Sequence, residues 1–268
     1  MRVSARRLFP AACAMFCALA AIPVSAQTVD EIVAKHIQAR GGYEKLKAIQ
    51  TIKISRTFAT NFSAVKVDSF KKRPNLLRIE QTPKGQPAPI PRGINADGAW
   101  DTVQGKVTMR PERVAVEGRE LDADFDGLLV DWKQKGHTVT LEGKDTIGGS
   151  EAYKMKVVTK GGSERLVYID TKSFMETGQA GRWLTPQMDQ KTKAFRHMDS
   201  IWIFSDFRDV DGVKFPFSVD EDRTQYAGPN ADIPITTSTA IYTDKIEVNV
   251  PMADTLFAPP SAAGDGKW

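Results

Sequence analysis

Apolar residues recur at helical spacing over residues 28–49. Thr28 with Glu31 three residues later forms a capping box, in which each side chain accepts a hydrogen bond from the other residue's backbone N–H. Gly41 and Gly42 are expected to end this first helix, and a short second helical turn follows over residues 43–49. Four apolar residues share one face of the first helix: Val29, Ile32, Val33 and Ile37.

From Thr51 onward the period of the apolar pattern changes to two, which is typical of strands with one buried face. Short turn signals recur every ten to fifteen residues or so and predict an antiparallel meander of about ten or eleven strands. A sheet with this many antiparallel strands must curl, so it has a concave face. The turn dipeptides are Asp97-Gly98, Gly148-Gly149, Gly161-Gly162 and Asp211-Gly212.

A second helical pattern interrupts the strands over residues 122–134, where Phe125, Leu128, Leu129 and Trp132 are spaced for one face of a helix. We expect the two helices to cover the concave face of the sheet. They would either enclose an apolar cavity or pack tightly and leave no space.

Three stretches are predicted to be long loops: residues 81–96, 178–199 and 227–235. Trp183 in the second loop would either contact a ligand or anchor the loop on the sheet. No linker divides the chain, so residues 27–268 are expected to form a single domain.

The first 26 residues have the features of a secretory signal peptide. Arg2, Arg6 and Arg7 precede an apolar stretch too short to cross a bilayer, and small residues precede a predicted cleavage point after Ala26. A retained membrane anchor is the alternative. Removal of this segment reduces the formal charge from +4 to +1, which argues against a nucleic-acid partner.

Both cysteines, Cys13 and Cys17, lie in the leader. The exported chain therefore has neither a disulfide nor a thiol nucleophile, and its stability must come from its core.

Motifs for catalysis or for a cofactor are absent from the sequence, so we predict a non-enzymatic protein without cofactor. The three histidines are far apart and show no metal-ligand spacing. Asp122, Asp124 and Asp126 match the first half of a calcium-binding loop, but Lys133 occupies the position of the final bidentate Glu. These acids instead suit the first turn of a helix, so no metal site is predicted.

Several segments together resemble the periplasmic outer-membrane lipoprotein-sorting proteins, which belong to the lipoprotein carrier superfamily. The resemblance begins with V-D-E-I-V-A-K-H at residues 29–36 and G-G-Y-E-K-L-K-A-I at residues 41–49, and it covers nearly the whole exported chain. It continues through residues 141–155, 167–170, 205–217, 246–252 and 256–260. The resemblance implies a half-open antiparallel barrel of eleven strands, with helices covering an apolar cavity for the acyl chains of lipoproteins.

The leading hypothesis is therefore a monomeric periplasmic carrier for lipoproteins or other lipids, with an inner-membrane donor and an outer-membrane acceptor protein as further partners. A lipid- or lipoprotein-responsive sensor or interaction module is the alternative, and a secreted hydrolase with an unrecognised pair of acids is a third reading. The predicted cavity wall consists of Phe58, Val65, Val67, Leu77, Ile79 and Trp100. The predicted lid consists of Ile32, Val33, Phe125, Leu129 and Trp132.

Overall fold

The computed structural model describes residues 27–188, 195–227 and 233–260. The predicted signal peptide, its cleavage point after Ala26 and both cysteines lie outside the described residues, as do parts of two predicted loops. Among the helices of the described part, none is long and apolar enough to cross a membrane.

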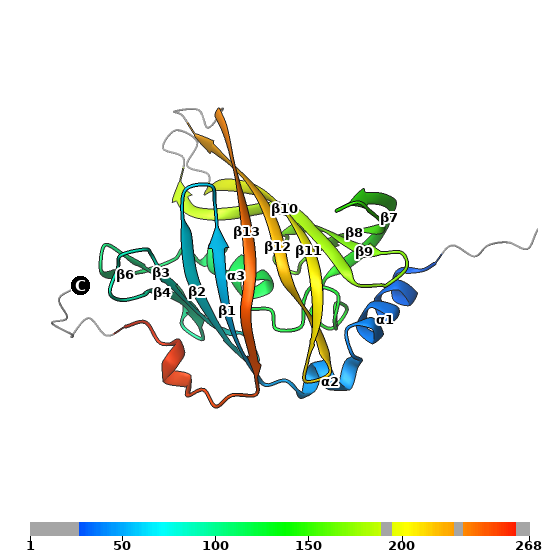
Figure 1. The fold of residues 1–268 in the computed structure, drawn as a ribbon, viewed down its shortest axis with the longest axis horizontal. Coiled ribbons are helices and arrows are strands. Elements are labelled where there is room, and N and C mark those ends of the chain that lie inside the picture. The colour runs from blue at the N-terminus through cyan, green and yellow to red at the C-terminus, as the bar shows by residue number, and fades with distance from the viewer. Residues whose placement is uncertain (1–26, 189–194, 228–232, 261–268) are drawn as a thin grey trace, which may run out of the picture.

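One antiparallel sheet of thirteen strands dominates the described structure, in the order β6-β5-β4-β3-β2-β1-β13-β12-β11-β10-β9-β8-β7. The sheet curls around an interior but does not close, because β6 and β7 are its two edges (Figure 1). The first half contains β1 Thr51–Ala59, β2 Ala64–Lys72, β3 Leu76–Thr82, β4 Ile90–Asn95, β5 Gly98–Val103 and β6 Lys106–Met109. The second half contains β7 Thr138–Ile147, β8 Ser150–Val158, β9 Glu164–Asp170, β10 Glu176–Met188, β11 Phe195–Val210, β12 Val213–Ala227 and β13 Ile233–Val248.

The predicted fold class, a half-open antiparallel barrel with helices, is confirmed, with thirteen strands in place of about eleven. The additional strand residues come from segments that were predicted to be loops. Pro91 lies within β4, where it is paired with Glu80 of β3, and the polar run after Gly178 belongs to β10. These segments were not recognised as strands because they contain prolines and polar residues, which are uncommon in strands, although they pair with neighbouring strands.

Each predicted turn dipeptide joins two neighbouring strands. Gly98 has a φ of +140° between β4 and β5, and Asp211 and Gly212 have φ values of +54° and +78° between β11 and β12. The glycine pairs at 148–149 and 161–162 likewise connect β7 to β8 and β8 to β9. The turn chemistry of these dipeptides is therefore consistent with the observed hairpins.

Helix α1 (Val29–Ala39) begins with the predicted capping box: the Thr28 N–H donates to Glu31 at 2.9 Å, and the Glu31 N–H donates to Thr28 at 3.2 Å. Helix α2 (Tyr43–Ala48) follows directly. Gly41 between them has a φ of +126°, and a Cβ at this position would lie 2.1 Å from the carbonyl oxygen of Gly212. The break between the helices is therefore packed directly against the turn of the β11–β12 hairpin.

The helix predicted over residues 122–134 is wrong. The third helix is α3 (Glu112–Leu121), and residues 122–136 form a series of turns. Positive φ values at Gly127 (+93°), Asp131 (+56°) and Gly136 (+76°) prevent a continuous helix, although the apolar spacing matches one. A short 3-10 helix, η1 (Asp254–Phe257), follows β13.

Three apolar clusters fill much of the interior between the sheet and the helices. The largest joins α1 and the turn segment to β7, β8 and β9 through Ile32, Leu129 and Met155. A second cluster joins α2 to β1, β12 and β13, and a third joins α3 to β3, β4 and β5. The end of the barrel that holds α1 and α2 is therefore solid.

Candidate functional site on the concave face

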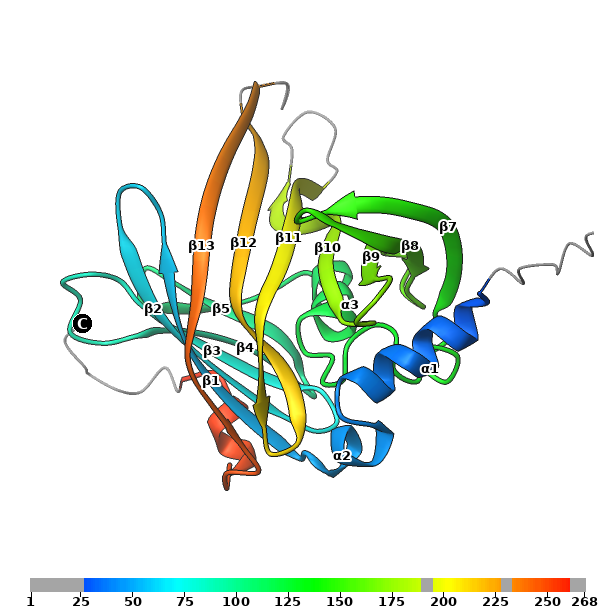
Figure 2. The ribbon, with the colours of Figure 1, turned by 45° about the vertical axis from the view of Figure 1, so that its right-hand side comes forward.

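Helix α3 lies inside the curl of the sheet and connects its two halves (Figure 2). Ala115 packs with Ile94 of β4 and Ala99 of β5. On its other side, Glu117 forms an ion pair with Arg165 of β9 at 2.9 Å and accepts the Leu184 N–H of β10 at 2.8 Å. The concave face left uncovered by α3 and the core clusters is the candidate binding surface.

A row of apolar side chains crosses five adjacent strands on this face. Strand register places the five residues opposite one another from β2 to β11, and directly opposed residues project to the same face of a sheet. In order they are Val65, Phe58, Ile241, Val219 and Phe204. Val65, Phe58 and Phe204 are only half-buried, so part of the row is open to solvent. We name these five residues the apolar row.

Two tryptophans lie beside the apolar row on the same face. Trp202 of β11 is opposite Glu221 of β12, one same-face position from Val219, and its ring centroid lies 4.8 Å from that of Trp183 on β10. The Arg165 guanidinium stacks over Trp183 at 4.0 Å from the ring centroid. Trp183 is buried on a strand, so it is an anchor on the sheet and not an exposed loop residue.

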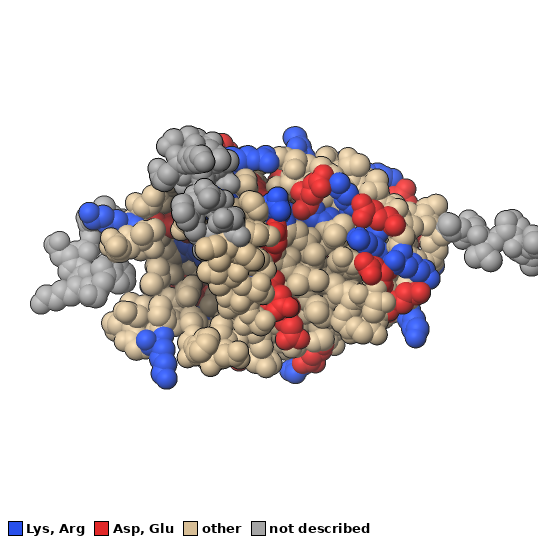
Figure 3. All heavy atoms as spheres, turned by 90° about the horizontal axis from the view of Figure 1, so that it is seen from above, with Lys and Arg blue, Asp and Glu red and all other residues tan. Residues whose placement is uncertain are grey.

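Cationic side chains share the concave face with the apolar row. Strand register places Arg56 of β1, Lys71 of β2, Arg92 of β4 and Arg223 of β12 on this face. Seen from above, Lys and Arg atoms are visible at the bottom of a recess between uncharged walls, left of the centre of the view (Figure 3). The concave face is therefore amphipathic, in contrast to the purely apolar cavity that the sequence predicted.

The structure brings four of the six predicted wall residues together. Phe58 and Val65 belong to the apolar row, Val67 lies opposite Arg56, and Ile79 lies opposite Arg92, all on the concave face. Leu77 is on the same face but is buried in the cluster with α3.

Trp100 projects to the opposite face of the sheet. Its neighbour Ala99 packs toward α3, so Trp100 must point outward, where its indole N–H donates to the Phe257 carbonyl at 3.3 Å. Gly93 opposite Trp100 makes room for the ring, since a Cβ there would lie 2.8 Å from it. Trp100 anchors the C-terminal segment and lies outside the concave face.

Three of the predicted lid residues are core residues. Ile32, Val33 and Leu129 are 0%, 5% and 1% exposed and pack with Met155 and neighbouring residues of β7–β9. Phe125 is half-buried, with the Arg73 guanidinium 4.3 Å above its ring, and Trp132 packs at the border of the largest cluster. These five residues hold α1 and the turn segment to the sheet.

The acidic motif over residues 122–127 is engaged by cations of the protein. Asp126 accepts bonds from Arg73 at 2.6 and 2.9 Å and from Lys47 at 2.7 Å, and Asp124 pairs with Lys135 at 2.7 Å. Burial raises the pKa of Asp126, but the hydrogen bonds and charges of Arg73 and Lys47 outweigh it and keep the pKa below its usual value. Within the described ranges, no cluster of three His, Cys, Asp or Glu side chains could hold a metal ion.

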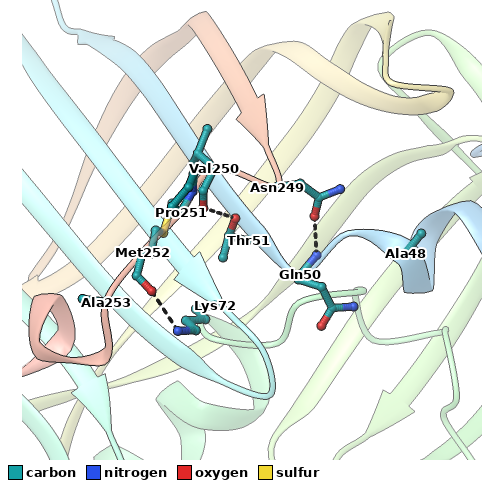
Figure 4. Close-up of a pocket in the computed structure, with 9 residues that line it drawn as sticks. All are labelled: Ala48, Gln50, Thr51, Lys72, Asn249, Val250, Pro251, Met252 and Ala253. Carbon is teal, nitrogen blue, oxygen red and sulfur yellow. Dashed lines mark hydrogen bonds between the residues drawn. The ribbon is translucent and has the colours of Figure 1, made fainter.

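Two hollows lie away from the apolar row. The first, about 650 Å³, is where the chain leaves β13 and passes the start of β1 (Figure 4). Its polar groups bind one another: Thr51 donates to the Val250 carbonyl at 2.6 Å and Lys72 to the Met252 carbonyl at 2.8 Å. The second, about 810 Å³, is lined by both charged and apolar residues of α3 and of strands β7 to β12, including Arg113, Glu164 and Leu166. Neither hollow is lined by a residue of the apolar row.

Sequence reasoning missed Ile241, Val219 and Phe204 of the apolar row and all four concave cations. A signal for the cations was present, since Arg56 precedes Phe58 by two residues and Arg92 precedes Ile94 by two. Residues two apart in a strand share a face, so the same alternation that selected the apolar wall also selects these cations.

No family model and no curated protein sequence matches the chain. Solved structures with the same architecture do match. A LolA superfamily protein from Nitrosomonas europaea has a TM-score of 0.54 at 10% identity, covering 87% of this chain and 99% of its own. A domain from Vibrio parahaemolyticus described as an outer membrane lipoprotein-sorting protein domain has a TM-score of 0.50 at 11% identity, covering 86% of this chain and 97% of its own. The resemblance predicted from the sequence is thus confirmed at the level of the fold.

Proposed function

We propose that the protein is a non-enzymatic carrier that binds a lipoprotein or another lipid through an acyl chain on the concave face. The observation that carries this proposal is the apolar row, which continues across five strands and leaves Val65, Phe58 and Phe204 half-buried. Apolar side chains that remain open to solvent inside a curled sheet gain free energy when an acyl chain covers them.

The size of the available surface suits a carrier that must also release its ligand. Each buried methylene contributes about 0.8 kcal/mol, so a completely enclosed acyl chain would be held too tightly for transfer. Here the core clusters fill one end of the barrel, and only the remainder of the concave face can accept the chain. Partial burial would keep the bound state reversible without a mobile lid.

The shared fold supports the periplasmic setting that the sequence suggests. The domain from Vibrio parahaemolyticus is described as lipoprotein-sorting, and its fold is similar to that of this chain. In our proposal the protein acts as a monomer after removal of residues 1–26 and moves its ligand from an inner-membrane donor toward an outer-membrane acceptor.

Native mass spectrometry and titration with a fluorescent acyl probe test the proposal on residues 27–268. We expect lipid to co-purify with the wild-type protein and the probe to bind. Phe58→Asp places a charge in the middle of the apolar row and should abolish both signals. Tyr242→Asp is the matched control, because Tyr242 adjoins Ile241 on β13 but projects from the opposite face and is 52% exposed. An empty wild-type protein that binds no probe overturns the proposal, as does a Phe58→Asp variant that binds normally.

A further inference from the structure

The concave cations have few anionic partners. Arg223 is bound by the buried carboxylate of Glu221 at 2.8 Å. Among the residues that the structure describes, Lys71 donates only to the backbone carbonyl of Asp124, at 3.2 Å, and Arg56 donates only to the Thr243 hydroxyl, at 3.4 Å. Arg92 makes no hydrogen bond or ion pair with any residue of the described ranges.

The carboxylates near these cations do not balance them. Asp101, opposite Arg92 on β5, is bound by two nitrogens of Arg110, both at 2.7 Å. Asp122 at the end of α3 is exposed, and its charge raises the pKa of both Lys71 and Arg92. Among the described residues, Lys71 and Arg92 therefore share the uncommitted carboxylate of Asp122, and no carboxylate acts on Arg56.

The cations lie on one face of the curled sheet. The positive charge of Arg223 lowers the pKa of Arg92, although the two residues come from β12 and β4 in opposite halves of the sheet. The charge of Arg56 likewise lowers the pKa of Lys71. Burial is the largest cause of the lowered pKa of Lys71 and of Arg56, whose pKa falls to about 10, whereas the Arg92 side chain is exposed. An anion placed among them would offset this cost.

The cations adjoin the surface that takes the acyl chain. Arg56 is two residues from Phe58 on β1, so the two side chains project from the same face about 7 Å apart. Val67 lies opposite Arg56 on β2, and Ile79 lies opposite Arg92 on β4. One molecule with an acyl chain and a charged head can therefore contact the apolar row and the cations together.

We propose that the ligand of the concave face is an anionic amphiphile, whose phosphate or carboxylate head is bound by Arg56, Lys71 and Arg92. This inference rests on the proposed carrier function and adds the chemical class of the ligand. Guanidinium groups suit such a head because they can donate two parallel hydrogen bonds to its oxygens.

Binding of two lipids with the same palmitoyl chain tests the inference. Lysophosphatidylglycerol has an anionic head and lysophosphatidylcholine a zwitterionic one, and isothermal titration with residues 27–268 gives their affinities. We expect the anionic lipid to bind about tenfold more tightly, with the preference falling as salt is raised. Equal affinities for the two lipids overturn the inference but leave the carrier function standing, whereas failure to bind either lipid overturns the carrier function itself.

Substitutions of the cations test whether they cause the preference for the anionic lipid. Arg92→Gln and Arg56→Gln should each weaken binding of the anionic lipid about tenfold and leave the zwitterionic lipid unchanged. Asp122→Asn should strengthen binding of the anionic lipid several-fold, because it removes the carboxylate that competes for the cations. Arg182→Gln is the matched control, since Arg182 is exposed and pairs with Asp199 at 2.9 Å on the opposite face of β10. Equal losses for both lipids in Arg92→Gln would overturn the assignment.

Titration with inorganic phosphate distinguishes a lipid with an anionic head from a free anion as the ligand. We expect phosphate alone to bind weakly, because it gains nothing from the apolar row, and to compete with the anionic lipid only at high concentration. Phosphate binding as tight as that of the lipid, and lost in Arg92→Gln, would identify a free anion as the ligand and overturn the amphiphile.

Discussion

Glu117 of α3 and Arg165 of β9 form a buried ion pair at 2.9 Å, with side chains 7% and 1% exposed. Ser163 and the Leu184 N–H complete the hydrogen bonds of the carboxylate, at 3.2 and 2.8 Å. These contacts hold α3 against β9 and β10 on the concave side of the sheet.

Removing the charge of Glu117 should destabilise the protein strongly. Glu117→Gln leaves the Arg165 guanidinium buried without its partner, and we expect the free energy of unfolding in urea to fall by about 3–5 kcal/mol. Glu112→Gln on the same helix breaks an exposed pair with Arg119 and should cost at most about 1 kcal/mol. Similar losses in the two variants would contradict the structural role given to the buried pair.

Acidification should destabilise the fold through His36. Burial and the charge of Arg40 lower the pKa of His36 to about 3, against the hydrogen bond with the Phe174 carbonyl, which raises it. The unfolded chain takes up this proton near pH 6.5 and the folded chain does not, so stability declines as pH falls from 6.5 toward 3. Between pH 7 and pH 5 we expect a loss of about 2 kcal/mol.

Urea denaturation at several pH values measures this loss. His36→Asn keeps a donor for the Phe174 carbonyl, 2.9 Å from the ring nitrogen in the wild type, but cannot be protonated. The pH slope between 7 and 5 should become shallower in this variant, with a remainder from His137, whose pKa is lowered by burial and by the charge of Lys135. An unchanged slope would assign the whole effect to other groups.

A side chain at position 41 should disrupt the contact between the helices and the β11–β12 turn. Gly41→Ala combines a positive φ with a Cβ 2.1 Å from the Gly212 carbonyl oxygen, so we expect a loss of more than about 2 kcal/mol in thermal or urea unfolding. Gly149→Ala also has a positive φ, +81°, but has open space around the Cβ. It should cost about 1 kcal/mol, and equal costs would rule out the close contact.

Leu129 should affect stability and not ligand binding. It is 1% exposed in the largest core cluster, so Leu129→Ala should lower the free energy of unfolding by about 2–5 kcal/mol. At a temperature where the variant is folded, its affinity for an acyl probe should equal that of the wild type. A selective loss of affinity would restore the lid role that the sequence suggested for this residue.

The features that were predicted correctly depend on neighbouring residues. The capping box of Thr28 and Glu31 and the turn at Asp211-Gly212 are complete within a few positions of the chain. Residues 122–134 show where prediction from local pattern fails. Apolar residues spaced every 3.6 positions predict a helix, but a series of turns can also place Leu128 and Leu129 against one surface. Helix α3 was not predicted because its buried face includes Glu117 and Gly118, which do not fit an apolar stripe. Glu117 is buried through its ion pair with Arg165, and Gly118 through its close contact with Ile94, both far away in the sequence.

The candidate site was predictable only in part for the same reason. Alternation correctly grouped Phe58 with Val65, since the two strands form a hairpin. Trp100 was assigned to the wrong face because β5 supplies no clear polar side, and only Phe257, far along the chain, shows which face buries it. The cations were missed because an interior was assumed to exclude charge, whereas a curled sheet can hold charge where solvent or a ligand reaches it.

Strand β13 is the last strand of the chain and the middle one of the sheet, with six strands on either side. Its neighbours β1 and β12 come from opposite ends of the strand sequence. Without β13, the strands form two separate groups, β1–β6 and β7–β12. The two groups of strands are joined only through β13, so the pairing of β1 with β13 is the one strand pairing of the described sheet that joins segments far apart in the sequence. Until β13 pairs with them, β1 and β12 each present an unpaired edge that a holding chaperone would need to shield.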